Sequence, residues 1–407
     1  MKEKQPPRQN RVLLLENIHP DAATRFQSAG YQVESLPHSL DESALRAKLP
    51  GVSILGIRSK TKITAPLLSH APDLAAIGAF CIGTDQLDLP ACARAGIAVF
   101  NAPYSSTRSV VEMVLGEILL LARGAVAKSG KLHRGEWDKS ATGSNEVRGK
   151  KLGIIGYGKI GSQLSVLAEA LGMEVYFYDV DVKLILGNAR KCRSLAQLLK
   201  TADFITLHVD GRSENRNLIA RREFQQIKPG AIFINASRGF VVDDNALAEA
   251  LHSGRIRAAA VDVFPREPKG NQEKFESPLQ KFEQVILTPH VAGSTEEAQQ
   301  DIGSFVSERI VEYVRDGSTL HSVNFPGVQL PKVKGAHRLI HIHENIPGML
   351  AQINHVLAVH SANILGQYLK TAENIGYAIT DIGSAYRGKI LEDLKRIPHT
   401  IKFRVLY

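Results

Sequence analysis

The sequence has little of what marks secreted, metal-binding or membrane proteins. It contains three cysteines in 407 residues, Cys81, Cys92 and Cys192, which are too few and too scattered for a disulfide framework or a metal site. No apolar run approaches the roughly 18 residues that a bilayer crossing requires. The first 11 residues are polar and charged, without the apolar core of a signal peptide. We therefore expect a cytoplasmic protein with no metal and no membrane partner.

The positive charge of the chain is not concentrated in any segment. The formal net charge is +9, but the basic residues form no Lys/Arg-rich run and are not interleaved with aromatics. This distribution argues against a nucleic-acid partner and suits the attraction of small anions such as phosphorylated acids. The hydrophobic content of 44% and the length of 407 residues indicate a globular protein of two or three domains.

The most informative segment is a glycine motif near the middle of the chain, Gly156-Tyr157-Gly158-Lys159-Ile160-Gly161. It follows an apolar run, 151–155, that predicts a buried strand. A predicted helix, 162–171, and a second strand, 174–178, follow it, and the strand ends at Asp179. Such glycines allow a tight turn against a pyrophosphate, and the acid suits the ribose hydroxyls of NAD rather than the phosphate of NADP. The residues predicted to bind NAD are Gly156, Gly158, Lys159, Ile160, Gly161 and Asp179.

Short apolar runs alternate with helical patterns on both sides of this motif. The alternation predicts an α/β protein with two doubly wound, Rossmann-like parallel sheets. The expected strands are 11–15, 52–57, 74–79 and 98–100 in the first sheet, and 204–209, 231–236, 258–263 and 285–287 in the second, after the motif. Helices are expected at 110–123 and 295–315.

The C-terminal segment predicts a separate small domain. Strands at 339–343, 363–369, 375–382 and 401–406 alternate with helices at 348–359 and 390–396 in the order βαββαβ. This order is the ferredoxin-like arrangement, which leaves open sheet edges. A second copy of the chain is therefore an expected partner.

Polar residues that suit an alcohol oxidation stand at the ends of the predicted strands. Arg238 follows 231–236, Asp262 lies within 258–263, Glu267 is on the next loop, and His290 follows 285–287. Histidine can accept the hydroxyl proton, a carboxylate can orient and charge-stabilise it, and arginine can bind a substrate carboxylate. These side chains would meet at the carboxyl edge of the sheet, beside a nicotinamide.

Three of these segments resemble motifs of the D-isomer-specific 2-hydroxyacid dehydrogenases: residues 235–239 (NASRG), 262–268 (DVFPREP) and 287–293 (LTPHVAG). The resemblance covers nearly the whole chain. Further segments resemble the bacterial subgroup that carries a C-terminal ACT domain, namely 56–59, 79–85, 100–103, 134–139 and 341–345. The subgroup implies NAD-dependent oxidation of 3-phospho-D-glycerate to 3-phosphohydroxypyruvate, the first step of L-serine biosynthesis.

The resemblance also implies domain boundaries and residue roles. Residues 1–107 and 295–332 would form a split substrate-binding domain, 108–294 the NAD-binding domain, and 337–407 the ACT domain. His290 would be the acid/base, Glu267 its partner, and Arg238 the ligand of the substrate carboxylate and carbonyl. Asp262 would face the nicotinamide amide. The remaining implied cofactor contacts are His208, Ala236, Arg238, His290 and Gly293, and the implied substrate contacts are Arg58, Ser59, Cys81, Ile82, Gly83 and, from a neighbouring subunit, Lys139.

The ACT resemblance implies an L-serine effector site at His343, Asn345 and Asn363, and a homotetramer. The alternative interpretation of this domain is a purely structural dimerisation module. For the whole chain, the alternatives are a reductase of another 2-keto acid (2-oxoglutarate, hydroxypyruvate or glyoxylate), an NADH-sensing binding protein on the same fold, and a catalytically inactive serine sensor.

Overall fold

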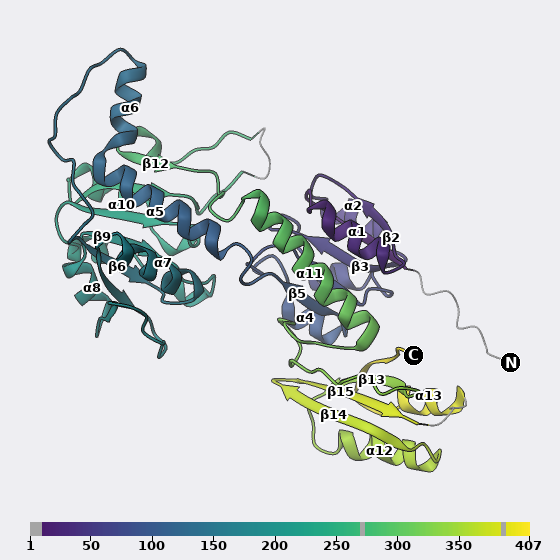
Figure 1. Ribbon diagram of the computed structural model, residues 1–407. Helices are drawn as coiled ribbons and strands as arrows, with labels where there is room; N and C mark the ends of the chain where they lie inside the picture. Colours follow the sequence, from purple (N-terminus) through teal and green to yellow (C-terminus); the bar gives the residue numbers. More distant parts are fainter. Residues whose placement is uncertain (1–9, 269–272, 384–387) are drawn as a thin grey trace. The chain divides into compact units, whose positions relative to one another are not determined.

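The computed structural model describes residues 10–268, 273–383 and 388–407 of the chain (Figure 1). The chain divides into two compact units. The first comprises Met1–Ser105 and Gln299–Tyr407, and the second comprises Ser106–Ala298. Within the described ranges, no helix combines the length and apolarity that spanning a bilayer would require.

The first unit contains a parallel sheet of five strands in the order β2-β1-β3-β4-β5. The strands are β1 (Arg11–Leu14), β2 (Gln32–Ser35), β3 (Val52–Ile57), β4 (Ala76–Ala79) and β5 (Ala98–Asn101). Its helices are α1 (Pro20–Ser28), α2 (Glu42–Lys48), α3 (Ala65–Leu68), α4 (Leu89–Arg94) and α11 (Glu296–Asp316). Buried side chains of α1 and α11 pack on one face of the sheet, and those of α2, α3 and α4 pack on the other.

The second unit contains a parallel sheet of seven strands in the order β12-β11-β10-β9-β6-β7-β8. The strands are β6 (Lys151–Ile155), β7 (Glu174–Tyr178), β8 (Arg190–Lys191), β9 (Phe204–Leu207), β10 (Ala231–Asn235), β11 (Ile256–Val261) and β12 (Val285–Leu287). Sequence order reverses between β6 and β9, and ligands of doubly wound sheets bind beyond the carboxyl ends of the strands at such a point.

Helices cover both faces of this second sheet, which explains why its central strands are almost continuously apolar. Helices α5 (Thr107–Arg123) and α7 (Lys159–Ala170) contribute buried side chains to one face. Helices α8 (Leu195–Thr201), α9 (Arg221–Gln226) and α10 (Asp244–His252) contribute to the other. The remaining helical segments are α6 (Ala125–His133), η1 (Ser213–Asn215), η2 (Gly239–Val241) and η3 (Pro278–Lys281).

The C-terminal part of the first unit is an antiparallel sheet in the order β14-β15-β13-β16. Its elements are β13 (His337–Glu344), α12 (Met349–Val359), β14 (Ile364–Ala372), β15 (Ile375–Ile382), α13 (Gly388–Lys395) and β16 (Thr400–Val405). Both helices pack on one face of the sheet, while residues of β13 and β15 join the core that contains α11 on the other. The predicted fold class, two doubly wound parallel sheets and a ferredoxin-like domain, is confirmed.

Candidate active site

A glycine turn between β6 and α7 supplies the backbone of a nucleotide site. Gly156 has a φ of +90°, and a Cβ there would lie 2.5 Å from the carbonyl oxygen of His208. A Cβ on Gly161 would lie 2.3 Å from the carbonyl oxygen of Gly156. At Gly158, by contrast, a Cβ would meet no protein atom within 4 Å. The turn itself therefore requires the outer two glycines, and the middle one leaves space for a pyrophosphate to approach the backbone.

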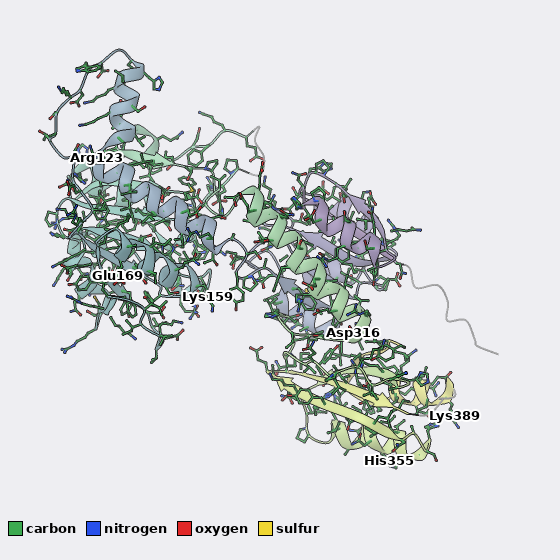
Figure 2. The ribbon with its side chains drawn as sticks, viewed as in Figure 1. Arg123, Lys159, Glu169, Asp316, His355 and Lys389 are labelled. Atoms are coloured by element: carbon green, nitrogen blue, oxygen red, sulfur yellow. The ribbon has the colours of Figure 1, made fainter. Side chains whose placement is uncertain are left out.

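Helix α7 begins at Lys159, which Figure 2 labels, and not at residue 162 as the sequence pattern suggested. Gly158 is its N-cap, and the amide of Ser162 donates to the carbonyl of Gly158 at 2.9 Å. The three amides before Ser162 are therefore not used by the hydrogen bonds of the helix itself. Amides at the positive end of a helix favour a phosphate group, so this turn fits a bound dinucleotide.

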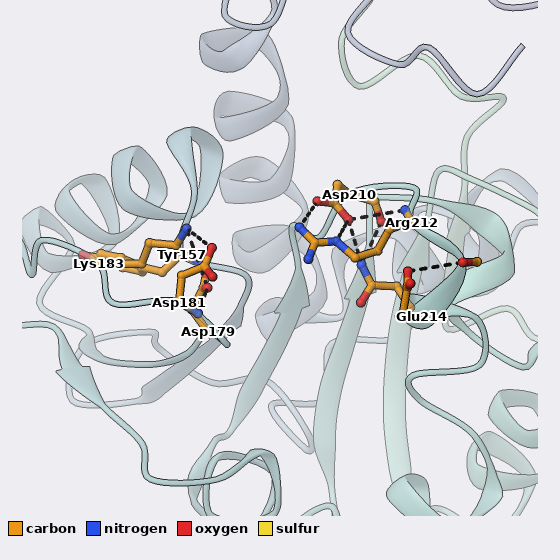
Figure 3. Close-up of polar contacts among 9 residues, drawn as sticks. Tyr157, Asp179, Asp181, Lys183, Asp210, Arg212 and Glu214 are labelled. Carbon is orange, nitrogen blue, oxygen red and sulfur yellow. Dashed lines mark hydrogen bonds and ion pairs between the residues drawn. The ribbon is translucent and has the colours of Figure 1, made fainter. Parts of the chain in front are cut away.

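The carboxylate of Asp179, just beyond β7, is held against this turn. Its Oδ2 accepts from the amide of Tyr157 at 2.7 Å, and its Oδ1 accepts from the amide of Asp181 at 2.9 Å. Lys183 Nζ lies 3.7 Å from the same Oδ1 (Figure 3). The carboxylate is thus fixed where the next strand ends, and its contact with a ribose remains a prediction.

Three further residues predicted to contact the cofactor follow the strands of this sheet. His208 follows β9, and burial lowers the pKa of its imidazole to about 3, so the ring is neutral. Its Nε2 lies 3.1 Å from Thr206 Oγ1, while Nδ1 is buried without a hydrogen-bond partner among the residues described. Ala236 follows β10 directly, and Gly293 lies on the loop after β12.

Arg238 follows β10 on a turn that is braced from within. Asn235 Oδ1 accepts from the amide and the hydroxyl of Ser237, at 3.1 and 2.8 Å. Asn235 Nδ2 donates to the carbonyl of Arg238 at 3.2 Å, and Arg238 Nη1 donates to the carbonyl of Ser237 at 2.8 Å. The arginine therefore leaves the sheet from a fixed backbone.

Glu267 and His290 form a hydrogen-bonded pair. His290 Nδ1 lies 3.0 Å from Glu267 Oε1 and 2.9 Å from Oε2, and the amide of Phe264 donates to Oε1 at 3.1 Å. An ionised carboxylate only accepts hydrogen bonds, so Nδ1 carries the proton in this pair. The other ring nitrogen, Nε2, is then available to exchange a proton with a substrate.

The charges around this pair adjust both of its members. The hydrogen bond that His290 donates to Glu267 raises the pKa of His290, while burial and the charge of Arg238 act in the opposite direction. Burial acts to raise the pKa of Glu267, but His290, the Phe264 amide and Arg238 together lower it. Arg238 is thus close enough to act electrostatically on both residues. The second unit brings a base, its orienting acid and a guanidinium together.

Asp262 supports the loop that carries His290. Its side chain is 2% exposed, and its Oδ1 accepts from Thr288 Oγ1 at 2.6 Å and from the amide of Val291 at 2.9 Å. Its Oδ2 accepts from the amide of Ala292 at 3.0 Å, and its carbonyl accepts from the amide of His290 at 2.8 Å. These bonds hold His290 with a φ of +56°, a sparsely populated conformation that surrounding contacts must maintain. Sequence reasoning missed this bracing role.

In the first unit, the predicted substrate residues follow β3 and β4 and are held together by two amide side chains. Arg58 and Ser59 follow β3, and Gln86 Nε2 donates to the carbonyl of Arg58 at 2.5 Å. Cys81, Ile82 and Gly83 lie just beyond β4, and Asn101 Nδ2 donates to the carbonyl of Ile82 at 2.6 Å. Cys81 Sγ donates to the carbonyl of Gly83 at 3.1 Å. The sequence offered no signal for Gln86 or Asn101, because their partners are distant loops.

A buried carboxylate fixes the loop that follows Arg58 and Ser59. Glu16, beyond β1, is 7% exposed and accepts from the amides of Lys60 and Thr61 at 2.9 and 2.8 Å. The loops after β1, β3 and β4 thus form one braced edge of the first sheet. Lys139 lies in the second unit, on the exposed loop after α6, and its substrate contact remains a prediction.

The predicted effector residues are not brought together within one chain. His343 is buried on β13, opposite Gly376 of β15, and its Nε2 has no hydrogen-bond partner among the residues described. Asn345 Nδ2 donates to the carbonyl of Glu373 at 2.8 Å, near the same end of the sheet. Asn363 precedes β14, and its carbonyl accepts from the amide of Gly383 at the other end of β15. The two ends of β15 are separated by roughly 24 Å at about 3.4 Å per residue.

The chain is similar to known proteins along almost its whole length. Residues 115–292 match the NAD binding domain of the D-isomer specific 2-hydroxyacid dehydrogenases, and residues 339–402 match the AHAS small subunit-like ACT domain. A D-3-phosphoglycerate dehydrogenase from Haemophilus influenzae is 51% identical over 98% of this chain and 97% of that protein. The protein of that name from Escherichia coli K12 is 48% identical, with the same coverage.

A solved structure with the same fold was determined with its ligands. It is a D-lactate dehydrogenase from Aquifex aeolicus, complexed with NAD and lactic acid. It matches with a TM-score of 0.68 and 26% identity, over 78% of this chain and all of that chain. Together, the comparisons confirm the predicted NAD-binding domain and the C-terminal ACT domain.

Proposed function

Because the chain belongs to the D-isomer-specific 2-hydroxyacid dehydrogenase family, we propose that it oxidises 3-phospho-D-glycerate to 3-phosphohydroxypyruvate with NAD, the first step of L-serine biosynthesis. The observation that carries this proposal is the His290–Glu267 pair, with Arg238 near it, beyond the strands of an NAD-binding domain. The identity of 51% to a protein named for this reaction supports the choice of substrate.

The residues of the chain would divide the reaction as follows. NAD, when bound, supplies the hydride acceptor. His290 accepts the proton of the C2 hydroxyl at Nε2 while the hydride leaves C2, and Glu267 stabilises the imidazolium that forms. Arg238 binds the substrate carboxylate and polarises the developing carbonyl oxygen. Asp262 keeps His290 in place and, by the family resemblance, faces the nicotinamide amide.

We also propose that residues of the first unit bind the substrate. Arg58, Ser59 and the backbone of Cys81, Ile82 and Gly83 would hold the carboxylate end and the hydroxyls, and Lys139 of a neighbouring copy would reach the phosphate. The braces from Glu16, Gln86 and Asn101 support this role, because a binding loop must be positioned before the substrate arrives. The domain boundaries that we propose are those implied by the family resemblance. The substrate-binding domain comprises 1–107 and 295–332, the NAD-binding domain comprises 108–294, and the regulatory domain comprises 337–407.

The test is a screen of NADH formation with purified protein. The acids are 3-phosphoglycerate, 2-hydroxyglutarate and glycerate, and the matching keto acids are tested with NADH in the reverse direction. The proposal predicts the highest kcat/KM for 3-phosphoglycerate. A higher value for an unphosphorylated acid would favour the second candidate, a 2-keto-acid reductase, which the likeness to D-lactate dehydrogenase supports. NADH binding without turnover of any acid would favour a binding protein.

We propose that the chain assembles as a homo-oligomer, a tetramer by family resemblance. Two features of its surface support self-association. Helix α6 has no fully buried residue. Its Leu132 is 56% exposed, and Trp137, just after it, is 80% exposed. Strand β14 is an open sheet edge and exposes Leu365 and Tyr368. Exposed apolar patches and open edges commonly mark contacts between chains.

We further propose that L-serine binds to the ACT domain where two copies pair and lowers activity. His343 and Asn345 of one copy would lie near Asn363 of the other, because these residues occupy opposite ends of one sheet. The buried Nε2 of His343, which has no hydrogen-bond partner among the residues described, supports a polar ligand there.

A reducing, cytoplasmic location fits the burial of Cys92 and Cys192 as thiols.

A further inference from the structure

The loop after β9, residues 208–215, lies where the sheet reverses its strand order. Strand β9 pairs with β6, and the amide of His208 donates to the carbonyl of Ile155 at 2.7 Å. A Cβ on Gly156 would lie against the carbonyl of His208, so this loop touches the glycine turn. The loop therefore forms one wall of the crevice in which doubly wound sheets bind nucleotides.

An arginine on this loop, Arg212, is held in a fixed position (Figure 3). Its Nε and Nη2 donate to the two carboxylate oxygens of Asp210, at 2.8 and 2.6 Å. Asn215 Nδ2 in turn donates to Asp210 Oδ1 at 2.9 Å and to its carbonyl at 3.0 Å. Because both members of the ion pair are about half exposed, it adds little to stability. The ion pair instead fixes the conformation of the Arg212 side chain before any ligand binds.

The opposite wall of this crevice carries an acidic group that follows β7. Asp179 holds the glycine turn, and Lys183 Nζ lies 2.9 Å from Asp181 Oδ2 (Figure 3). The pKa of Asp181 is lowered, first by this contact with Lys183 and also by the charge of Arg212. The glycine turn touches both loops, since the amide of Tyr157 donates to Asp179 and Gly156 packs against the carbonyl of His208. The segment between them is where Asp179 would hold the adenosine ribose.

We propose that Arg212 stacks its guanidinium on the adenine ring of bound NAD, with Asp210 as the residue that positions it. The inference rests on the proposed NAD-dependent function and extends it to the adenine end of the cofactor. It assigns the Asp210–Arg212 pair to cofactor binding, a role that the glycine motif alone does not provide.

The hydrogen bonds of Arg212 decide between adenine and phosphate as its target. Asp210 takes the Nε–Nη2 edge of the guanidinium, which is the edge that would otherwise bind a phosphate in a two-point contact. The same carboxylate neutralises the charge, so the pair offers little to a 2′-phosphate. The flat faces of the guanidinium remain, and guanidinium planes stack on bases.

Direct binding measurements on the full-length protein test this proposal. The probes are NADH, ADP-ribose and reduced nicotinamide mononucleotide, which lacks the adenine. Arg212→Ala should raise the Kd of NADH and of ADP-ribose about tenfold, as expected for the loss of one stacked base. It should leave the Kd of the mononucleotide unchanged, because that probe has no adenine to stack. Arg212→Lys should lose as much affinity, because it keeps the charge but not the flat face.

The matched control is Arg216→Ala. Arg216 is an exposed arginine just after η1, and its guanidinium lies over Phe240, 5.2 Å from the ring centroid. This variant should bind all three probes like the wild type. Wild-type affinity of Arg212→Ala for NADH, or of Arg212→Lys for ADP-ribose, would overturn the stacking role. Binding is read here without turnover, so a wild-type protein that binds NADH but does not oxidise 3-phosphoglycerate would refute the proposed function alone.

Discussion

At the residue scale, the proposed oxidation depends on the protonation of His290. To accept the hydroxyl proton, its Nε2 must be unprotonated, so the rate of oxidation should rise with pH through the pKa of this histidine. The hydrogen bond that His290 donates to Glu267 raises that pKa. The pair therefore makes His290 a stronger base and fixes the orientation of its ring. The raised pKa also means that a higher pH is needed before the ring is unprotonated.

Replacing Glu267 with Gln should move the pH profile in a known direction. Without the carboxylate charge, the imidazolium is less stable, so the pKa of His290 falls and the ascending limb of kcat/KM shifts to lower pH. We expect kcat to fall about tenfold or more, since the neutral amide also allows other ring orientations. Initial rates of NADH formation across pH measure both effects.

The matched control is Glu283→Gln, which removes an exposed carboxylate that pairs with Arg134 in the same unit. This variant should keep the wild-type profile. If Glu267→Gln kept it as well, the hydrogen bond seen in the structure would have no role in setting the base.

Asp262 should contribute more to stability than its predicted contact with nicotinamide would suggest. Its two carboxylate oxygens accept three hydrogen bonds from the histidine loop, and an amide in its place could not accept all of them. We expect Asp262→Asn to lower the free energy of unfolding by about 2 kcal/mol, the scale of hydrogen bonds to a charged group. Urea denaturation measures this loss, and Asp301→Asn, on an exposed position of α11, is the control. Equal stability of the two variants would show that the brace is dispensable.

The residues proposed to carry the chemistry could be selected from the sequence because their spacing places them after strands. The grouping of Arg238, Glu267 and His290 could be predicted because the carboxyl ends of parallel strands share one edge of the sheet. Glu16, Gln86 and Asn101 could not be predicted, because each bonds to the backbone of a loop far away in sequence. The same holds for Arg212, whose significance depends on which loops face each other.

At the scale of elements, the turn between β6 and α7 makes distinct demands on its glycines. Gly161→Ala should cost about 1–3 kcal/mol of stability, because a Cβ would meet the backbone of Gly156. Gly158→Ala should leave the stability close to that of the wild type but weaken NADH binding about tenfold or more, since the methyl group takes the space left for the pyrophosphate. Thermal unfolding without cofactor and NADH titration separate these effects. Equal NADH affinity of Gly158→Ala and the wild type would contradict the assigned site.

Elements with a strong apolar pattern could be located accurately from sequence, and elements that bury little or nothing could not. The strands β6, β7, β12 and β15 match the predicted ranges. Strand β2 was missed because none of its residues is fully buried, and α6 was missed because it buries none. Helix α7 begins three residues before its predicted start, because the glycine motif itself forms the first helical turn.

At the scale of the whole molecule, regulation should depend on association between copies. Since His343 and Asn363 lie at opposite ends of one sheet, a single chain cannot supply both to one serine. The double variant Leu365→Lys, Tyr368→Asp adds charge to the exposed edge strand β14, and it should weaken both self-association and serine binding. Sedimentation velocity and calorimetry with serine measure the two effects. Serine binding to a monomeric variant with wild-type affinity would contradict a site shared between copies.

At the same scale, we expect this molecule to oxidise a 2-hydroxy acid with His290 as the base. The most direct test compares wild-type protein with His290→Ala for NADH formation from 3-phosphoglycerate, with the NADH Kd measured for each. We predict turnover by the wild type and a loss in kcat of about a thousandfold in the variant, with NADH binding retained. A variant that binds NADH and retains most of the wild-type turnover would contradict the account.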